Sequence, residues 1–227
     1  MLQNAYQIGL NWAKNYGIPQ NEQAHIARAF ADNCAFLHIN PDALSWRAKL
    51  KPDVATMSDN DIGMLAKKYF DAYVRNDHPA HPSTCPDPAL SIVMQLAFGY
   101  PQGMQQTILD HQYAMCAENA VGSLLERYLD SQLRPHGWSW CCGDMVKAVD
   151  FIMYDQSKNQ WYALQIKNRD NSENSSSSAI RNGTTIEKWF RTFSKRPETN
   201  WHNVPHLMQG YGLSEENFIQ FLYTYLQ

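Results

Sequence analysis

Three side chains in the second half of the chain have the types and spacing of a hydrolytic metal site. Asp150 is followed fifteen residues later by Gln165, and Lys167 stands two positions after Gln165. A carboxylate and an amide oxygen are hard ligands for a divalent cation, and an ammonium group can orient an attacking water or balance charge on a phosphate. The trio therefore suits the hydrolysis of a phosphodiester bond.

The elements that must position this trio are two strands within residues 145–169. Residues 145–154 and 161–168 are rich in Val, Ile, Phe, Tyr and Trp, and the sequence DQSKNQ between them is typical of a turn. We therefore expect a β-hairpin that carries the trio at its open end.

The hairpin explains how the three side chains can meet. Folding at the centre of the turn places Asp150 opposite Ile166, and Gln165 and Lys167 point to one face because side chains alternate along a strand. A small shift in register brings Asp150 to the same face. An ordinary amphipathic hairpin with a solvated Lys167 is the alternative interpretation.

A glutamate in a predicted helix over residues 105–133 could add a third acidic ligand. Glu118 shares a helical face with Val121, Leu125 and Leu129, and a charged group is seldom buried without a partner. It could supply the charge that the neutral Gln165 lacks. A local salt bridge and a different helical phase are the alternatives, and in the second case Glu126 takes the role.

The segment after the hairpin, residues 168–196, has the composition of a DNA-contacting surface. Between Gln165 and Arg196 there are seven Lys or Arg and three Asp or Glu, in a chain whose net charge is -3. Such side chains bind phosphates and base edges. The residues expected to contact DNA are Asn168, Arg169, Asn171, Asn174, Ser175, Ser176, Arg181, Asn182, Thr184, Lys188 and Arg191.

Within this segment, residues 184–196 are predicted to form an amphipathic helix. Its basic residues Lys188, Arg191 and Lys195 recur on one face suited to phosphates, and Arg169 and Arg181 are the expected base readers. A flexible serine-rich linker is the alternative interpretation of residues 168–192.

The order of the trio resembles the PD-(D/E)xK nuclease superfamily. The chain departs from that pattern at Val149, where a proline often lies, and at Gln165, which replaces the usual second acid. The run KNRDNSENSSSSAIRNGTTIEKWFR resembles the SinI family of type II restriction endonucleases in particular, within a similarity that covers residues 115–203.

This resemblance implies a homodimer that uses Mg²⁺ to cut both strands of double-stranded DNA at a short palindromic site, GG(A/T)CC. It implies a mixed α+β fold whose central mixed sheet is flanked by helices. The expected catalytic residues are Asp150, Gln165, Lys167 and Glu118, of which Asp150, Glu118 and Gln165 would hold the metal. No organic cofactor is expected.

The order of helices and breaks predicts the domain organisation. Residues 3–16 and 21–37 have helical spacing, and a further helix begins at Ser58. The proline-rich residues 76–88 mark a boundary between a helical N-terminal region, 1–88, and a nuclease core, 89–227. A last helix is predicted over residues 214–226.

Composition narrows the class of protein. A 44% apolar fraction with 12% aromatic residues indicates a folded globule, and no stretch approaches a membrane span. Five cysteines, an odd number without paired spacing, fit a reducing cytoplasm. A repair or recombination nuclease and a DNA-binding module without catalysis are the alternative functions.

Overall fold

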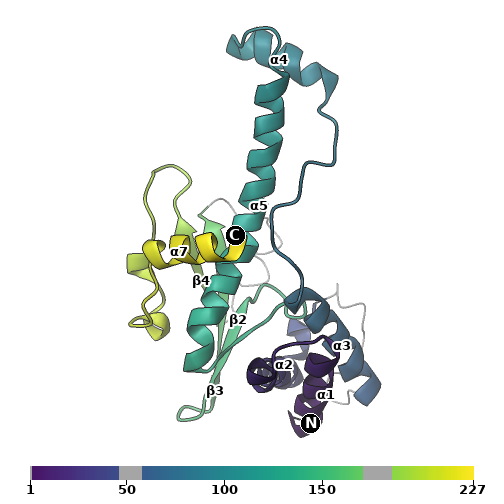
Figure 1. Ribbon diagram of the computed structural model, residues 1–227. Coiled ribbons are helices and arrows are strands. Elements are labelled where there is room, and N and C mark those ends of the chain that lie inside the picture. The colour runs from purple at the N-terminus through teal and green to yellow at the C-terminus, as the bar shows by residue number, and fades with distance from the viewer. Residues whose placement is uncertain (1, 46–57, 171–185) are drawn as a thin grey trace.

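The computed structural model describes residues 2–45, 58–170 and 186–227, which form a sheet surrounded by helices (Figure 1). The α-helices in these ranges are α1 (Leu2–Asn15), α2 (Gln20–Ile39), α3 (Asp59–Tyr73), α4 (Pro88–Phe98), α5 (Gln105–Leu133) and α7 (Glu215–Leu226). Short 3-10 helices are η1 (Pro41–Ala43), η4 (Arg134–His136), η5 (Trp201–Asn203) and η6 (His206–Met208). None of these described helices combines the length and the apolarity needed to span a membrane.

The described strands form one mixed sheet. They are β1 (Trp138–Trp140), β2 (Phe151–Asp155), β3 (Gln160–Arg169) and β4 (Ile186–Thr192), in the spatial order β1-β2-β3-β4. The β1–β2 and β2–β3 pairs are antiparallel, and β4 runs parallel to β3. This architecture confirms the predicted mixed α+β class with a central sheet flanked by helices.

Strands β2 and β3 are the predicted hairpin, with one correction to its register. Phe151 pairs with Leu164, so the strands are symmetric about Ser157 and Lys158. Continuing this register places Asp150 level with Gln165, not with Ile166. The one-residue difference is the shift that brings Asp150 to the face of Gln165.

The first strand of the hairpin is shorter than predicted. Residues 145–149 leave the sheet and pair instead with the segment after α2, where the Ser45 N–H donates to the Met145 carbonyl at 2.9 Å and the Lys147 N–H donates to the Ala43 carbonyl at 2.8 Å. The segment just before Asp150 is thereby tied to the end of α2.

One hydrophobic core joins the helices at both ends of the chain to the sheet. It contains Phe30 of α2, Tyr69 and Phe70 of α3, Phe151 of β2 and Phe218 of α7, together with the C-terminal half of α5. The predicted helices before residue 76 are confirmed as α1, α2 and α3. They belong to this shared core, so they buttress the sheet and do not form a separate globule.

A buried amide fixes α2 to the sheet. Asn33 is fully buried, and its Nδ2 donates to the Trp140 carbonyl of β1 at 3.0 Å and to the Ala29 carbonyl within α2 at 2.8 Å. The two bonds from its amide NH₂ group define where α2 meets β1.

Helix α5 is continuous over its predicted range and has two different environments. Its C-terminal half packs on the sheet, whereas its N-terminal half extends away from the body and meets α4 at the far end (Figure 1). We refer to residues 78–117 as the arm. Residues 76–88 connect α3 to α4, and the domain boundary placed there from the sequence stays a prediction.

The predicted helix over residues 184–196 is wrong. Residues 186–192 form β4, in which Trp189 pairs with Ile166 of β3 and is buried against Trp201, with ring centroids 4.9 Å apart. Its indole Nε1 donates to the Asn200 carbonyl at 3.2 Å. Aromatic and β-branched residues in this short run favour a strand once a partner strand is available, and tertiary packing overrides the helical spacing.

The turn that leads from β1 toward Asp150 requires glycine at position 143. Gly143 has a φ of 83°, and a Cβ there would lie 2.7 Å from the Lys68 carbonyl oxygen of α3. The close approach of this turn to α3 therefore depends on the missing side chain.

We predict that Gly143→Ala lowers the free energy of unfolding by about 3 kcal/mol or more, because it adds a steric clash to left-handed backbone strain. Gly137→Ala is the matched control, since Gly137 has the same φ of 83° with nothing within 4 Å of the added Cβ. It should lose only about 1 kcal/mol. Urea unfolding measures both values, and equal losses would contradict the assigned contact.

Candidate active site

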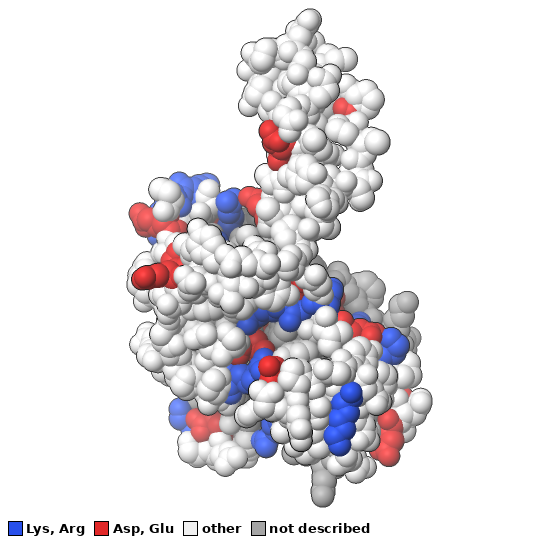
Figure 2. All heavy atoms as spheres, in the orientation of Figure 1, with Lys and Arg blue, Asp and Glu red and all other residues white. Residues whose placement is uncertain are grey.

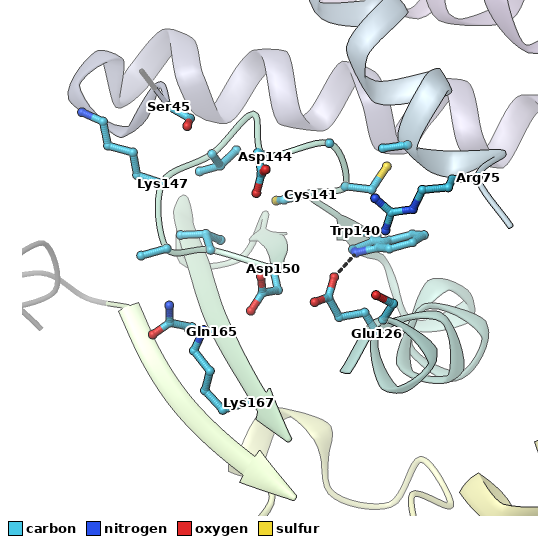
Figure 3. A pocket seen from close by; sticks show the side chains of 17 residues that line it. Ser45, Arg75, Glu126, Trp140, Cys141, Asp144, Lys147, Asp150, Gln165 and Lys167 are labelled. Atoms are coloured by element: carbon cyan, nitrogen blue, oxygen red, sulfur yellow. Dashed lines mark hydrogen bonds between the residues drawn. The ribbon is translucent and has the colours of Figure 1, made fainter. Parts of the chain in front are cut away.

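A cleft of about 460 Å³ lies where the hairpin, α5 and the segment before β2 meet. Glu126, Asp150, Gln165 and Lys167 line it together, and Figure 3 shows their side chains around a common space. The sequence-predicted trio therefore converges, and a helical acid joins it.

Asp150 is held rigidly at the mouth of the hairpin. Its N–H donates to the Leu164 carbonyl at 2.8 Å, and its Oδ2 accepts the Ile166 N–H at 2.6 Å. Its own carbonyl accepts the Cys141 N–H at 2.8 Å. These bonds fix both the backbone and the carboxylate, so the direction of Asp150 toward the cleft follows from the sheet itself.

Gln165 and Lys167 come from the same face of β3. Gln165 is 3% exposed, and its Oε1 has no hydrogen-bond partner among the described residues. Lys167 is exposed at the outer side of the cleft. An unpaired buried carbonyl oxygen is costly unless a cation or water meets it, so Gln165 Oε1 has the property expected of a ligand atom.

Glu126 approaches the cleft from α5. The Trp140 indole Nε1 donates to its Oε2 at 3.1 Å, as the dashed line in Figure 3 marks. The guanidinium of Arg127 lies 5.4 Å from the centroid of the Trp140 ring and is ion-paired with Asp77. Trp140 thus orients the glutamate, and the chain before α4 helps to hold Trp140.

Burial makes both acids harder to ionise. It raises the pKa of Asp150 to about 6, although the Ile166 N–H and Lys167 counteract part of the rise. Burial and then the charge of Asp150 raise the pKa of Glu126 to about 8, against the hydrogen bond from Trp140 and the charge of Lys167. Two buried acids that each resist ionisation form a site that favours a bound positive charge.

The donor set fits a hard divalent cation. Two carboxylates and the unpaired amide oxygen of Gln165 are oxygen ligands of the kind that Mg²⁺ prefers. Within the described ranges no three His, Cys, Asp or Glu side chains form a cluster suited to a metal ion. The third ligand from the protein is therefore expected to be Gln165 itself.

Glu118 lies outside this cleft, and the prediction that it is buried is wrong. Its side chain is 63% exposed and lies 3.5 Å from the Arg169 guanidinium. The helical phase was correct, but α5 begins to pack on the body only near Ala120, so position 118 is already at the base of the arm. The local salt bridge, one of the alternatives from the sequence, is observed.

The expected DNA-contacting residues fall into two groups. Asn168 and Arg169 lie at the end of β3, and Lys188 and Arg191 lie on β4. The others, Asn171, Asn174, Ser175, Ser176, Arg181, Asn182 and Thr184, lie outside the described residues.

Arg191 is held inside the protein. Its side chain is 12% exposed, its Nε donates to Asn168 Oδ1 at 3.0 Å, and its Nη1 lies 2.5 Å from a carboxylate oxygen of Glu215. Its guanidinium also lies 5.0 Å from the Phe218 ring centroid. These contacts give Arg191 a structural role that joins β4 to α7, whereas the Arg169 side chain is 49% exposed.

Three notable residues are among the cleft residues that were not singled out from the sequence. Trp140 positions Glu126, Arg75 lines the cleft beside Trp140, and Asp144 lies on the turn before β2 with a φ of 53° (Figure 3). A non-glycine residue in the left-handed region next to a cluster of charged groups is typical of functional sites. The sequence does not reveal this feature, because it depends on the backbone conformation. The short strand β1 that presents Trp140 was also missed.

Comparison with known proteins gives a consistent set of similarities. Residues 11–227 match the family model described as SinI restriction endonuclease. The chain is 45% identical over 192 residues to the type II restriction enzyme Eco47I of Escherichia coli, covering 84% of this chain and 83% of that protein. It is 51% identical over 150 residues to the type II restriction enzyme SinI of Salmonella infantis, covering 66% and 65%.

The raised pKa of Glu126 predicts how stability changes with pH when no divalent cation is present. The folded chain keeps this proton up to about pH 8, whereas the unfolded chain releases it near the ordinary pKa of 4.5. The unfolded state therefore binds fewer protons between these values, and the free energy of unfolding falls as pH rises. Glu126→Gln should remove a fall on the order of a few kcal/mol.

Urea unfolding at pH 5.5 and pH 8, with a chelator present, measures this difference. Adding Mg²⁺ at pH 8 should raise the free energy of unfolding of the unchanged chain more than that of Glu126→Gln. The reason is that a cation bound to Glu126 would take the place of the proton. The same dependence on pH in both proteins would show that Glu126 does not titrate in this way.

Proposed function

The chain belongs to the SinI restriction endonuclease family and is a type II restriction endonuclease, and on that premise we propose that it cuts both strands of DNA at GG(A/T)CC, as a homodimer with Mg²⁺. Restriction enzymes of this type bind double-stranded DNA and generally need a divalent metal. The recognition sequence, the choice of Mg²⁺ and the homodimer are what the resemblance to this family implies.

The observation that carries the proposal is the convergence of Asp150, Glu126, Gln165 and Lys167 on one cleft. We assign Asp150, Glu126 and the Oε1 of Gln165 as the groups that would hold Mg²⁺. The bound cation would polarise the scissile phosphate and lower the pKa of a water. The helical acid in this proposal is Glu126, the alternative that the sequence left open.

The other steps belong to the chain's own groups. The ammonium group of Lys167 lies at the outer side of the cleft, where it can orient the attacking water or balance charge on the phosphate. The Ile166 N–H and the Trp140 indole hold the two carboxylates in place, so little reorganisation is needed when DNA enters.

For recognition we propose the segment from Asn168 to Arg191, which begins where the catalytic strand ends. Arg169 stands two positions after Lys167 on the same face of β3, so it lies close to the scissile phosphate. An exposed guanidinium can pair bidentately with a guanine edge. Arg181 remains the second proposed base reader.

A cleavage assay on plasmid DNA tests the activity. With Mg²⁺ the protein should yield discrete fragments whose ends map to GG(A/T)CC, and a chelator should abolish cutting. Plasmid with every such site changed to GG(G/C)CC is the matched substrate and should stay intact. Non-specific nicking would indicate a repair-type nuclease, and binding without cutting would indicate a DNA-binding module.

We predict that Asp150→Ala, Lys167→Ala and Glu126→Ala each lower the cleavage rate by about 10³-fold or more, because each loses several kcal/mol of transition-state stabilisation. Glu118→Ala is the matched helical control and should stay within about tenfold of the unchanged chain. Single-turnover rates on a cognate duplex measure this, and duplex binding in Ca²⁺ shows that folding is intact. Loss of activity in Glu118→Ala with an active Glu126→Ala would reverse the assignment.

We predict that Arg169→Ala loses about 1 to 3 kcal/mol of discrimination at one base pair and keeps its affinity for unrelated DNA. Lys188→Ala is the comparison, and should weaken binding to every sequence and flatten its salt dependence by about one charge. Binding isotherms in Ca²⁺ at several salt concentrations, on cognate and scrambled duplexes, separate the two effects. Unchanged discrimination in Arg169→Ala would place recognition elsewhere.

A further inference from the structure

The arm, residues 78–117, is the part of the chain that the cleft and the recognition segment leave unexplained. It consists of an extended strap, α4 and the N-terminal half of α5, and it projects from the body (Figure 1). Its buried residues are Met104 and Ile108, and neither belongs to the main hydrophobic core. The arm therefore contributes little to the stability of the body from which it extends.

The surface of the arm is unusually apolar. Its large exposed side chains are Ile92, Val93, Leu96, Phe98, Tyr100, Leu109, Tyr113 and Met115, with exposed fractions between 37% and 80%. They lie on α4, in the segment that follows it and in the N-terminal half of α5, and a standard protein interface takes about 800 Å² from each partner. Large apolar side chains that are exposed close together often mark a surface that meets another protein.

The charge of the arm disfavours DNA as its partner. The sequence has no Lys or Arg between Arg75 and Arg127, and the acidic residues within the arm are Asp87 and Asp110. Figure 2 shows the arm as an almost uncharged surface above a body that carries many charged side chains. Without Lys or Arg the arm can offset little of the charge of phosphates, so a protein surface is the better partner.

A second copy of this chain is the occupant that these features favour. The described chain carries one candidate cleft, and the proposed cutting of both strands of a palindrome in one binding event calls for two clefts related by a twofold axis. A twofold interface places the same patch on both sides, so it must be self-complementary. An apolar surface with two acidic residues and no Lys or Arg meets this condition, because it presents few like charges to its own copy.

We propose that the arm is the dimerisation surface, in which α4 and the N-terminal half of α5 pack against the same elements of a second copy. This inference rests on the proposed function and deepens it. Helix α5 runs without a break from Tyr113 to Glu126, a rise of about 20 Å, so a joint between arms also fixes the spacing of the two clefts.

The test is the mass of the protein in solution. Leu96→Glu combined with Phe98→Glu places two carboxylates on positions that are 80% and 73% exposed, so the chain can fold normally. The dimer dissociation constant from sedimentation velocity should rise at least 100-fold. Tyr223→Glu on α7, where the residue is 62% exposed, is the matched control and should remain dimeric.

Urea unfolding of the body should be the same in all three proteins once they are compared as monomers. The proposal is overturned if the double variant keeps the mass of a dimer. It is also overturned if the unchanged chain is monomeric both alone and on cognate duplex. If the double variant stays dimeric and the protein cuts DNA into discrete fragments, the arm interface is contradicted and the nuclease proposal is supported. If the dimer depends on the arm but the protein cuts no DNA, the arm interface is supported and the nuclease proposal is contradicted.

Discussion

Holding two carboxyl groups in one poorly hydrated cleft is the constraint around which this structure is built. Asp150 and Glu126 come from different elements, a strand end and a helix. Burial raises the pKa of both groups, and the charge of Asp150 raises that of Glu126 further. Each acid therefore needs a fixed hydrogen-bond donor that does not itself move, and these donors are the Ile166 N–H and the Trp140 indole. Both belong to the sheet, which links the chemistry to the most rigid part of the fold.

The surrounding packing keeps those donors in place. Asn33 ties α2 to the backbone of Trp140, and the turn at Gly143 lies against α3 so closely that a side chain would not fit. Arg127 packs against the Trp140 ring and ion-pairs with Asp77, in the segment that precedes the arm. The N-terminal helices are thus supports of the cleft, which explains why they share one core with the sheet.

Local patterns predicted much of this fold, and they failed where tertiary context decides. The helices, the hairpin and the trio follow from periodicity and spacing, because each depends on residues close in sequence. Strand β4 was predicted as a helix because Lys188 and Arg191 have helical spacing, but Trp189 is buried beside β3 and Trp201. For Glu118 the face was right, and its burial was wrong because sequence periodicity cannot show where a helix leaves the body.

Helix α5 connects these observations. A soluble helix normally has one polar and one apolar face along its whole length, whereas α5 changes environment along its axis. Near residue 126 it carries a buried acid beside the sheet, and before residue 118 it carries exposed apolar side chains on an arm without Lys or Arg. Solubility as a monomer would favour more charged residues on such an arm. The lack of Lys and Arg fits the proposal that α5 holds an acid at one end and meets a second protein surface at the other.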